Sequence, residues 1–414
     1  MRKSMSTTGT SWADLKTEMT AIAEGDADWR SGRTAVYVFN AGDDVLGVAA
    51  DAYRMFLSEN ALGARRAFPS LARMEGDVVQ FGLSLLNAPD AAVGDMTSGG
   101  TESIMLAVKA CREHWRSRGR DVTDGEILAP QSVHPAFNKA AEYLGLKVVR
   151  IAVSEDLTAD AAAMAAAVNA NTLMIVGSMP CFPYGVIDPI ADLSDIALEH
   201  DLWLHVDACV GGYFAPFARL NGVNLPAFDF ALPGVSSMSA DLHKYGYAAK
   251  GASTVFYRDE ERRKGQIFEF GDWPCGVMQT HTLPGTRPGG AIAAAWAVMN
   301  YLGVDGYRQK AQDVVTARQR LVAGFKEIEG LEVFGAPQLG LIAYGAKDCD
   351  IHAVADRLAA AGWVSARIDP PRGIHLMLSP RHLDVVDDYL ADLQTAITAV
   401  RAEGSTSAGG AVYS

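Results

Sequence analysis

Short apolar segments alternate with amphipathic segments between residues 61 and 258. Four of the apolar segments have the length and composition of buried strands, namely 126–129, 147–151, 172–177 and 202–206. The amphipathic runs at 135–144 and 190–200 are typical of helices. Strand–helix alternation of this kind predicts an α/β domain whose mostly parallel sheet is covered by helices on both faces. Ligands bind to such sheets beyond the carboxyl ends of the strands.

The pattern changes after a helical run at 291–302. Strands are predicted at 331–334, 339–344 and 373–378, and helices at 351–361 and 383–402. This order predicts a small α+β domain at the C-terminal end. The first sixty residues predict an arm that carries two helices, near 11–24 and 45–59. We therefore expect an N-terminal arm (1–60), a large domain (61–303) and a small domain (304–414).

Composition and charge narrow the classes of function. The chain has 414 residues and a net charge of −13, which argues against a nucleic-acid partner because such partners usually need a basic stripe. Its five cysteines form no CxxC motif, which is typical of free thiols in a reducing cytoplasm. The first eleven residues lack the apolar core of a signal peptide, and no apolar run approaches the ~18 residues of a membrane span. We expect a cytoplasmic protein without a transmembrane segment.

Two segments carry the candidate chemistry. Asp207 ends the apolar segment 202–206, and Lys244 follows on the polar turn Ser239-Ala240-Asp241-Leu242-His243-Lys244. Catalysis with pyridoxal phosphate (PLP) needs a lysine amine that forms a Schiff base with the aldehyde. It also needs a carboxylate that keeps the pyridine nitrogen protonated, so that the ring accepts electrons. Together the two segments predict a PLP enzyme.

Two further features fit the same cofactor. The loop Thr97-Ser98-Gly99-Gly100-Thr101-Glu102-Ser103 precedes a helical run, and glycines there let backbone N–H groups approach a phosphate. His134 lies at a strand-to-helix turn, where a flat imidazole can stack on a pyridine ring. Taken alone, the loop could be an ordinary helix cap and His134 a surface residue. Their order along the chain, ahead of Asp207 and Lys244, favours the cofactor site.

These segments resemble the fold type I PLP enzymes of the group II decarboxylase kind, and most closely the sphingosine-1-phosphate lyases. The resemblance extends from about residue 34 to 381, and the run around Lys244 is its most specific part. The matching segments are 96–103, 134–140, 205–212, 239–251 and 285–290. The resemblance implies a PLP-binding large domain of the transferase-like α/β fold with a small C-terminal domain, and no metal. The absence of an anchor resembles the soluble bacterial members.

The resemblance also implies roles for individual residues. Lys244 matches the Schiff-base lysine, Asp207 the partner of the pyridine nitrogen and His134 the stacking residue. The remaining expected cofactor contacts are Ser98, Gly99, Gly100, Thr101, Ser239, His243 and Thr286. The loop that contains Thr286 and Arg287 resembles one that reaches the phosphate site of the neighbouring subunit, which implies a homodimer with shared active sites.

Expected substrate contacts follow from the same resemblance. Lys250 matches a lysine that helps to bind the substrate phosphate, and Tyr37 matches a tyrosine that lines the active site and is a candidate for catalysis. The segment from Asn60 departs from the family, because a histidine near the substrate phosphate has no counterpart here and Arg65 and Arg66 appear instead. Arginine forks bind phosphate or carboxylate well. Three interpretations of the pair remain open. The arginines replace the histidine, they bind a different acidic headgroup, or they face solvent.

The implied reaction is retro-aldol cleavage of a phosphorylated, lipid-derived β-hydroxy amine to a fatty aldehyde and phosphoethanolamine. Tyr37, Lys250 and an oxygen of the substrate phosphate are candidates for the base that removes the β-hydroxyl proton. The alternative reaction is α-decarboxylation of an L-amino acid, which needs the same grip on the cofactor. A catalytically idle protein of this fold would have lost Lys244 or Asp207, and both are present.

Overall fold

The large domain is built on a seven-stranded sheet. The computed structural model describes residues 2–64 and 66–411. The strand order is β1-β7-β6-β5-β4-β2-β3, and all neighbours are parallel except the two pairs that involve β7. The strands are β1 (Val93–Thr97), β2 (Glu126–Pro130), β3 (Lys147–Ile151), β4 (Thr172–Ser178), β5 (Trp203–Asp207), β6 (Val235–Ala240) and β7 (Ser253–Tyr257).

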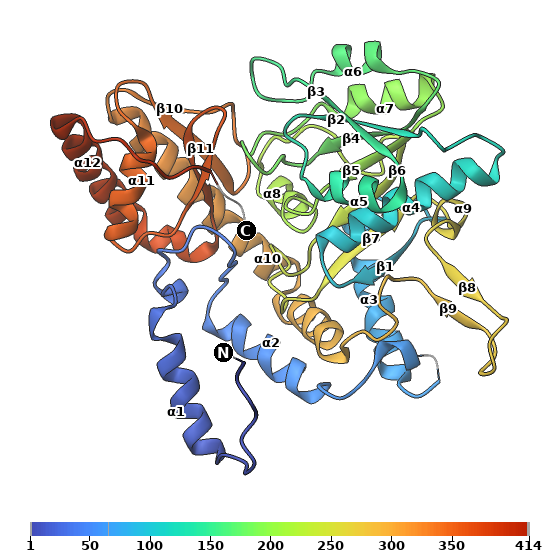
Figure 1. Cartoon of the computed structure of the whole chain (residues 1–414). Helices are drawn as coiled ribbons and strands as arrows, with labels where there is room; N and C mark the ends of the chain where they lie inside the picture. Colours follow the sequence, from blue (N-terminus) through green and yellow to red (C-terminus); the bar gives the residue numbers. More distant parts are fainter. Residues whose placement is uncertain (1, 65, 412–414) are drawn as a thin grey trace.

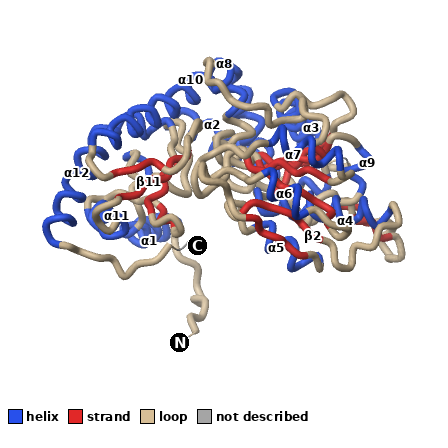
Figure 2. Tube along the Cα trace, turned by 90° about the horizontal axis from the view of Figure 1, so that it is seen from above, coloured by secondary structure: helices blue, strands red, loops and turns tan. Residues whose placement is uncertain are grey.

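Helices cover both faces of this sheet (Figure 2). The strands β4 to β7 are fully buried along their length, and this explains why β4 and β5 read as nearly continuous apolar runs rather than alternating ones. The helices of this part are α3 (Pro69–Leu85), α4 (Gly100–Ser117), α5 (Ala136–Leu144), α6 (Ala161–Ala167), α7 (Ile190–Glu199), α8 (Ala215–Leu220) and α9 (Glu260–Lys264). A separate hairpin, β8 (Phe268–Phe270) with β9 (Met278–Thr280), projects from the domain beside β1 (Figure 1).

The small domain is a four-stranded antiparallel sheet with helices. Its strand order is β10-β11-β13-β12. The elements are β10 (Leu331–Val333), β11 (Leu341–Ala346), α11 (Ile351–Ala360), β12 (Ala366–Ile368), β13 (Gly373–Met377) and α12 (Val386–Glu403). The long helix α10 (Gly289–Glu327) runs from the large domain along the small one (Figures 1 and 2), and Gly303 interrupts its helical geometry with φ 54° and ψ −172°.

The N-terminal arm joins both parts of the molecule. Helix α1 (Trp12–Ile22) buries none of its residues, whereas α2 (Asp43–Met55) packs against α10. Between them the chain runs along the small domain, where the Ala35 N–H donates to the Val364 carbonyl at 2.7 Å. The arm therefore reaches the large domain by way of the small one.

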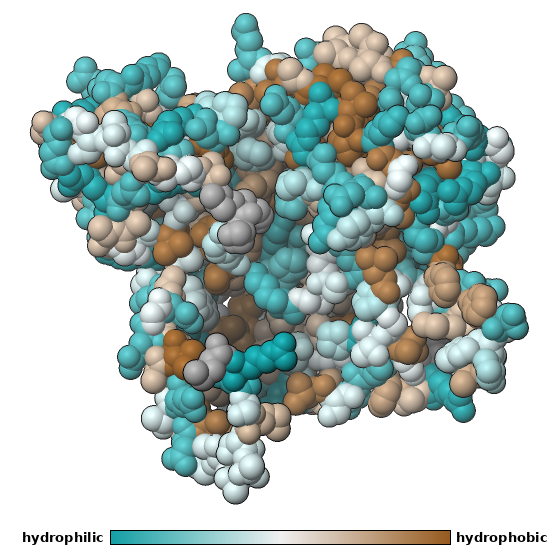
Figure 3. Space-filling view, viewed as in Figure 1, coloured by the Kyte–Doolittle hydropathy of each residue, from teal (hydrophilic) through white to brown (hydrophobic). Residues whose placement is uncertain are grey.

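The expected fold class is confirmed: a mostly parallel α/β large domain is followed by a small C-terminal domain. The predicted division at 303/304 falls at the irregular Gly303 inside α10. The sequence pattern missed the strands β1, β6 and β7, whose short segments contain glycine, serine and threonine. No helix among the described residues is long and apolar enough to cross a membrane. The face shown in Figure 3 is largely hydrophilic, with a paler apolar group over the alanine-rich α6 at its upper edge.

Candidate active site

A cavity of about 160 Å³ opens at the carboxyl ends of the central strands. Asp207 is the last residue of β5, and Lys244 lies on the turn that follows β6. Because β5 and β6 are parallel neighbours, both residues reach the same edge of the sheet. The cavity is lined by Gly100, Thr101, Ile104, His134, Pro180, Phe182, Asp207, Cys209, Val210, Asp241, His243 and Lys244.

The carboxylate of Asp207 is held in place by donors from its own surroundings. Its Oδ1 accepts hydrogen bonds from the Cys209 N–H at 3.1 Å and the Ser239 hydroxyl at 3.3 Å. Behind it, the His205 ring lies between the hydroxyls of Ser237 and Ser239. Burial lowers the pKa of His205 to about 4, so this ring is neutral near pH 7. Ser239 is fully buried and does not line the cavity, so it acts by positioning the carboxylate.

Lys244 is paired with a carboxylate that the sequence analysis did not single out. Its Nζ lies 3.1 Å from Oδ2 of Asp241, whose residue is 2% exposed. Burial alone would lower the pKa of Lys244, but the nearby Asp241 carboxylate raises it above its ordinary value. Burial likewise opposes ionisation of Asp241, and the charges of Lys244 and His243 nevertheless hold its pKa below the ordinary value. The two residues therefore form a buried ion pair at the cavity wall.

The glycine loop brings the start of α4 to the same cavity. A Cβ atom at Gly100 would lie 2.8 Å from Oδ2 of Asp241 and 2.9 Å from Sγ of Cys209, so a side chain here would displace the buried carboxylate. Thr101 is exposed and lines the cavity. The N–H groups in the first turn of a helix have no partners within the helix, and the helix dipole favours an anion there.

Ser98 and Gly99, which precede α4, do not line the cavity. Both the N–H and the hydroxyl of Ser98 donate to Oε2 of Glu102, at 2.7 and 2.6 Å. The other oxygen of Glu102 accepts from the Leu283 N–H at 2.8 Å. Ser98 therefore shapes the turn, while Gly99 is extended and a Cβ there would have no atom within 4 Å.

His134 reaches the cavity from the turn before α5. The Ala136 N–H donates to its Nδ1 at 3.1 Å, so in the neutral ring the proton sits on Nε2. Burial lowers the pKa of His134, although the charge of Asp207 opposes this shift. Near neutral pH the structure therefore holds a flat, uncharged imidazole on the wall that also carries Asp207 and Lys244.

Lys250 and Tyr37 lie together beside His243, next to the residues that line the cavity. Nζ of Lys250 donates to the Tyr37 carbonyl at 3.0 Å and to the His243 carbonyl at 3.4 Å. Tyr37 is an exposed non-glycine residue with φ of 63°, a left-handed conformation that Lys250 helps to hold. Desolvation lowers the pKa of Lys250, and the charge of Lys244 acts in the same direction. Lys250 thus fastens the arm to the loop that follows Lys244.

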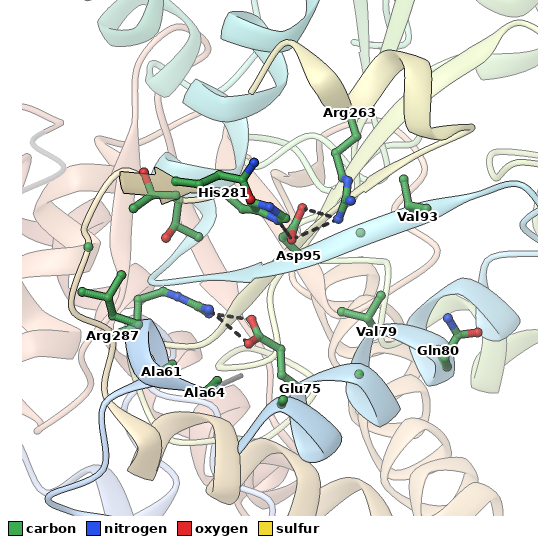
Figure 4. Close-up of a pocket in the computed structure, with 18 of the residues that line it drawn as sticks. Ala61, Ala64, Glu75, Val79, Gln80, Val93, Asp95, Arg263, His281 and Arg287 are labelled. Carbon is green, nitrogen blue, oxygen red and sulfur yellow. Dashed lines mark hydrogen bonds and ion pairs between the residues drawn. The ribbon is translucent and has the colours of Figure 1, made fainter. Parts of the chain in front are cut away.

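The remaining predicted residues lie around a second pocket of about 480 Å³ (Figure 4). Arg66 lines it, and Arg65 lies outside the described residues. Asn60 Nδ2 donates to the exposed Thr286 hydroxyl at 3.2 Å. The Arg287 guanidinium forms a two-pronged ion pair with Glu75 at 2.5 and 3.0 Å, which Figure 4 shows below the strand that carries Asp95. The structure thus brings Asn60 to the 285–287 loop but not to Lys250.

Sequence reasoning missed three features of the cavity wall. Asp241 lies three residues before Lys244 on the same polar turn, and this spacing was the available signal. Cys209 follows Asp207 closely, but a lone cysteine in an apolar context gives no functional signal. Pro180 and Phe182 follow β4 and have no polar chemistry that a pattern could reveal.

The cavity fits PLP by the chemistry of its residues. A lysine amine, a fixed carboxylate and a neutral imidazole share one small cavity, and the helix N-terminus at Gly100 meets it at one side. The amine suits the aldehyde of PLP, and the carboxylate suits its pyridine nitrogen. The imidazole suits the flat ring, and the helix N-terminus suits the phosphate.

Comparison with known proteins agrees with this assignment. The pyridoxal-dependent decarboxylase conserved domain matches residues 2–347. The chain is 41% identical over 393 residues to a sphingosine-1-phosphate lyase of Arabidopsis thaliana, covering 93% of this chain and 72% of that protein. It is 34% identical over 343 residues to a probable L-tyrosine/L-aspartate decarboxylase of Methanothermobacter thermautotrophicus, covering 83% and 92%. The solved structure of a sphingosine-1-phosphate lyase from Burkholderia pseudomallei superposes with a TM-score of 0.93 at 35% identity, covering 98% of this chain and 94% of that one.

Proposed function

Because the chain belongs to the sphingosine-1-phosphate lyase family of pyridoxal-dependent enzymes, we propose that it cleaves a sphingosine 1-phosphate-like amine to a fatty aldehyde and phosphoethanolamine. It is a PLP-dependent aldehyde-lyase. The observation that carries the proposal is the single cavity that holds Lys244, Asp207 and His134 at the start of α4.

In this proposal four residues that line the cavity hold different parts of the cofactor. When bound, PLP supplies the electron sink for the pair that is released as the bond between the amine carbon and the hydroxyl carbon breaks. Asp207, fixed by Cys209 and Ser239, holds the proton on the pyridine nitrogen. The neutral imidazole of His134 stacks on the ring, and the backbone at Gly100 and Thr101 binds the phosphate.

The ion pair with Asp241 controls the proton on Lys244. The amine must lose a proton from Nζ before it can bond to an aldehyde carbon. Oδ2 of Asp241 is the nearest carboxylate acceptor, 3.1 Å away. Because the pair raises the pKa of Lys244 and lowers that of Asp241, we assign Asp241 the task of holding Nζ in place and keeping it protonated until its proton leaves to solvent.

Lys250 is the cation that we assign to the phosphate of the substrate. It lies beside His243 at the edge of the cavity, and its ammonium is held by carbonyl oxygens rather than by a carboxylate. Its positive charge is therefore available to an anion. Arg66 lines the second pocket, and Asn60 bonds to Thr286 beside it. We therefore propose that these two residues act at the 285–287 loop rather than beside Lys250.

We further propose that the active unit is a homodimer with shared sites. Thr286 is exposed, and the nearby β8–β9 hairpin exposes Phe268, Phe270 and Met278. A contiguous exposed apolar group of this kind is typical of a protein interface. The guanidinium of Arg287 is engaged by Glu75 of its own chain, so Thr286 is the side chain better placed to meet a partner. A cytoplasmic location is also part of the proposal, in keeping with the free thiols of Cys111, Cys181 and Cys209.

Product analysis tests the proposed reaction. Purified holoenzyme is offered sphingosine 1-phosphate, sphingosine and a panel of amino acids that includes tyrosine and aspartate. The proposal expects a fatty aldehyde from the first substrate. If an amino acid instead yields carbon dioxide and a primary amine, and no aldehyde forms from sphingosine 1-phosphate, the protein is a decarboxylase. That is the activity named for the similar protein of Methanothermobacter thermautotrophicus.

A further inference from the structure

A segment of the large domain connects the cofactor cavity to the small domain. Residues 179–186 follow β4, and Pro180 and Phe182 line the cavity. The same segment touches the small domain at several points. The Tyr184 hydroxyl donates to the Pro370 carbonyl at 3.0 Å, and Tyr184 belongs to a small apolar cluster against which Ile368 packs.

Gly185 shows how closely the two parts approach. Its φ is +71°, and a Cβ atom there would collide with the carbonyl of Leu341 in β11. The segment is therefore fixed against the small-domain sheet rather than free at the rim of the cavity. A displacement of the small domain would carry Phe182 with it.

His375 of β13 makes the most specific of these contacts. Its Nδ1 lies 3.2 Å from the Pro183 carbonyl, and its ring centroid is 4.6 Å from that of Phe182, with the planes 40° apart. Phe182 in turn meets His134 edge-on, with centroids 6.5 Å apart and planes at 89°. Three rings thus run from the small-domain sheet to the residue that faces the cofactor.

The two ring nitrogens of His375 differ in their hydrogen bonding. The residue is fully buried, and burial lowers its pKa to about 4, so the ring is neutral and Nδ1–H is the donor to Pro183. Its Nε2 has no hydrogen-bond partner among residues 2–64 and 66–411. An apolar ring would avoid that unsatisfied nitrogen, so the bond to Pro183 is what an imidazole adds at this position.

We propose that His375 is a positioning residue for the reaction: it holds Phe182 against His134, and so the docked small domain fixes the ring that stacks on the cofactor. The inference rests on the proposed PLP site. It assigns His375 no contact with substrate or cofactor.

Two replacements separate the contacts of His375. His375→Phe keeps a ring against Phe182 and removes the donor to Pro183. His375→Asn keeps an N–H near the place of Nδ1 and removes the ring. His352→Phe is the matched control, because His352 is another fully buried histidine of the small domain that bonds a backbone carbonyl, that of Ile368.

The first readout is visible circular dichroism of the bound cofactor without substrate, which reports how the ring sits in its asymmetric site. We expect His375→Phe and Phe182→Ala to change this signal in the same way, and His375→Asn to restore part of it. We expect His352→Phe to lower the melting temperature and leave the signal unchanged. Since no substrate is present, this outcome does not depend on which reaction the enzyme catalyses.

The second readout is turnover of sphingosine 1-phosphate. A small misplacement of a reacting group costs up to about a hundredfold in rate, so we expect kcat to fall by about tenfold or more in His375→Phe with a smaller change in KM. The double variant with Phe182→Ala should be no worse than the poorer single variant, because both act through one contact. Unchanged dichroism and kcat in a folded, cofactor-loaded His375→Phe protein, or fully additive losses in the double variant, would overturn the proposal.

Discussion

Nζ of Lys244 lies 3.1 Å from Oδ2 of Asp241, three residues earlier on the turn that follows β6. The carboxylate is buried and raises the pKa of the lysine above its ordinary value. Its carboxylate also lies so close to Gly100 that a side chain at that position would displace it. One carboxylate therefore links the lysine to the start of α4, where the cofactor phosphate is expected.

Replacing Asp241 with asparagine tests this link through pH. Without the carboxylate the pKa of Lys244 falls, so the reactive free amine exists at lower pH. The rate at which the apoenzyme takes up PLP should rise with pH in both proteins, and the rise should begin at lower pH in Asp241→Asn. An identical pH profile in a correctly folded variant would show that Asp241 does not control the proton on Lys244.

Asp207→Asn should keep the cofactor and lose most turnover. The amide keeps the size of the side chain but cannot hold the pyridine nitrogen protonated, so the electron sink is weakened. Loss of a preorganised electrostatic partner typically lowers kcat by about 100- to 1000-fold. The measurement is kcat with the visible absorbance of the cofactor as the loading control. Near-normal kcat would refute the role of Asp207.

Much of this site could be predicted from the sequence, because the chemistry of Asp207 and Lys244 and their places at strand ends are local features. The α/β alternation gave the strands β2 to β5 for the same reason. The contacts between Phe182 and His375 could not be predicted, because they join residues far apart in the chain through the packing of two sheets. The ion pair of Arg287 with Glu75 depends on tertiary packing in the same way.

Lys250→Ala should weaken binding of the phosphorylated substrate selectively. A charge-assisted contact contributes about 1.5–3 kcal/mol, so KM for sphingosine 1-phosphate should rise about ten- to hundredfold. Sphingosine, which lacks the phosphate, should change little. The steady-state comparison of the two substrates is decisive: an equal loss for both would mean that Lys250 acts only by fastening the arm at Tyr37.

Hybrid dimers test whether sites are shared. Thr286→Glu should be inactive if Thr286 approaches the partner's cofactor phosphate, because it would add a negative charge there. Mixing it with inactive Lys244→Ala chains should restore about a quarter of the native activity, since random exchange makes half of the dimers hybrid with one intact site each. If subunits exchange and no activity returns, or if Thr286→Glu alone is fully active, each site belongs to a single chain.

The most direct test of the account measures both products of sphingosine 1-phosphate by mass spectrometry, with native holoenzyme and with Lys244→Ala. Lys250→Ala serves as the control for loss of a nearby lysine, since it should keep the visible absorbance of the bound cofactor. The account predicts fatty aldehyde and phosphoethanolamine in equal amounts from the native enzyme, and neither product nor cofactor absorbance from Lys244→Ala. Equal product formation by Lys244→Ala, or no aldehyde from a fully loaded native enzyme, would contradict it.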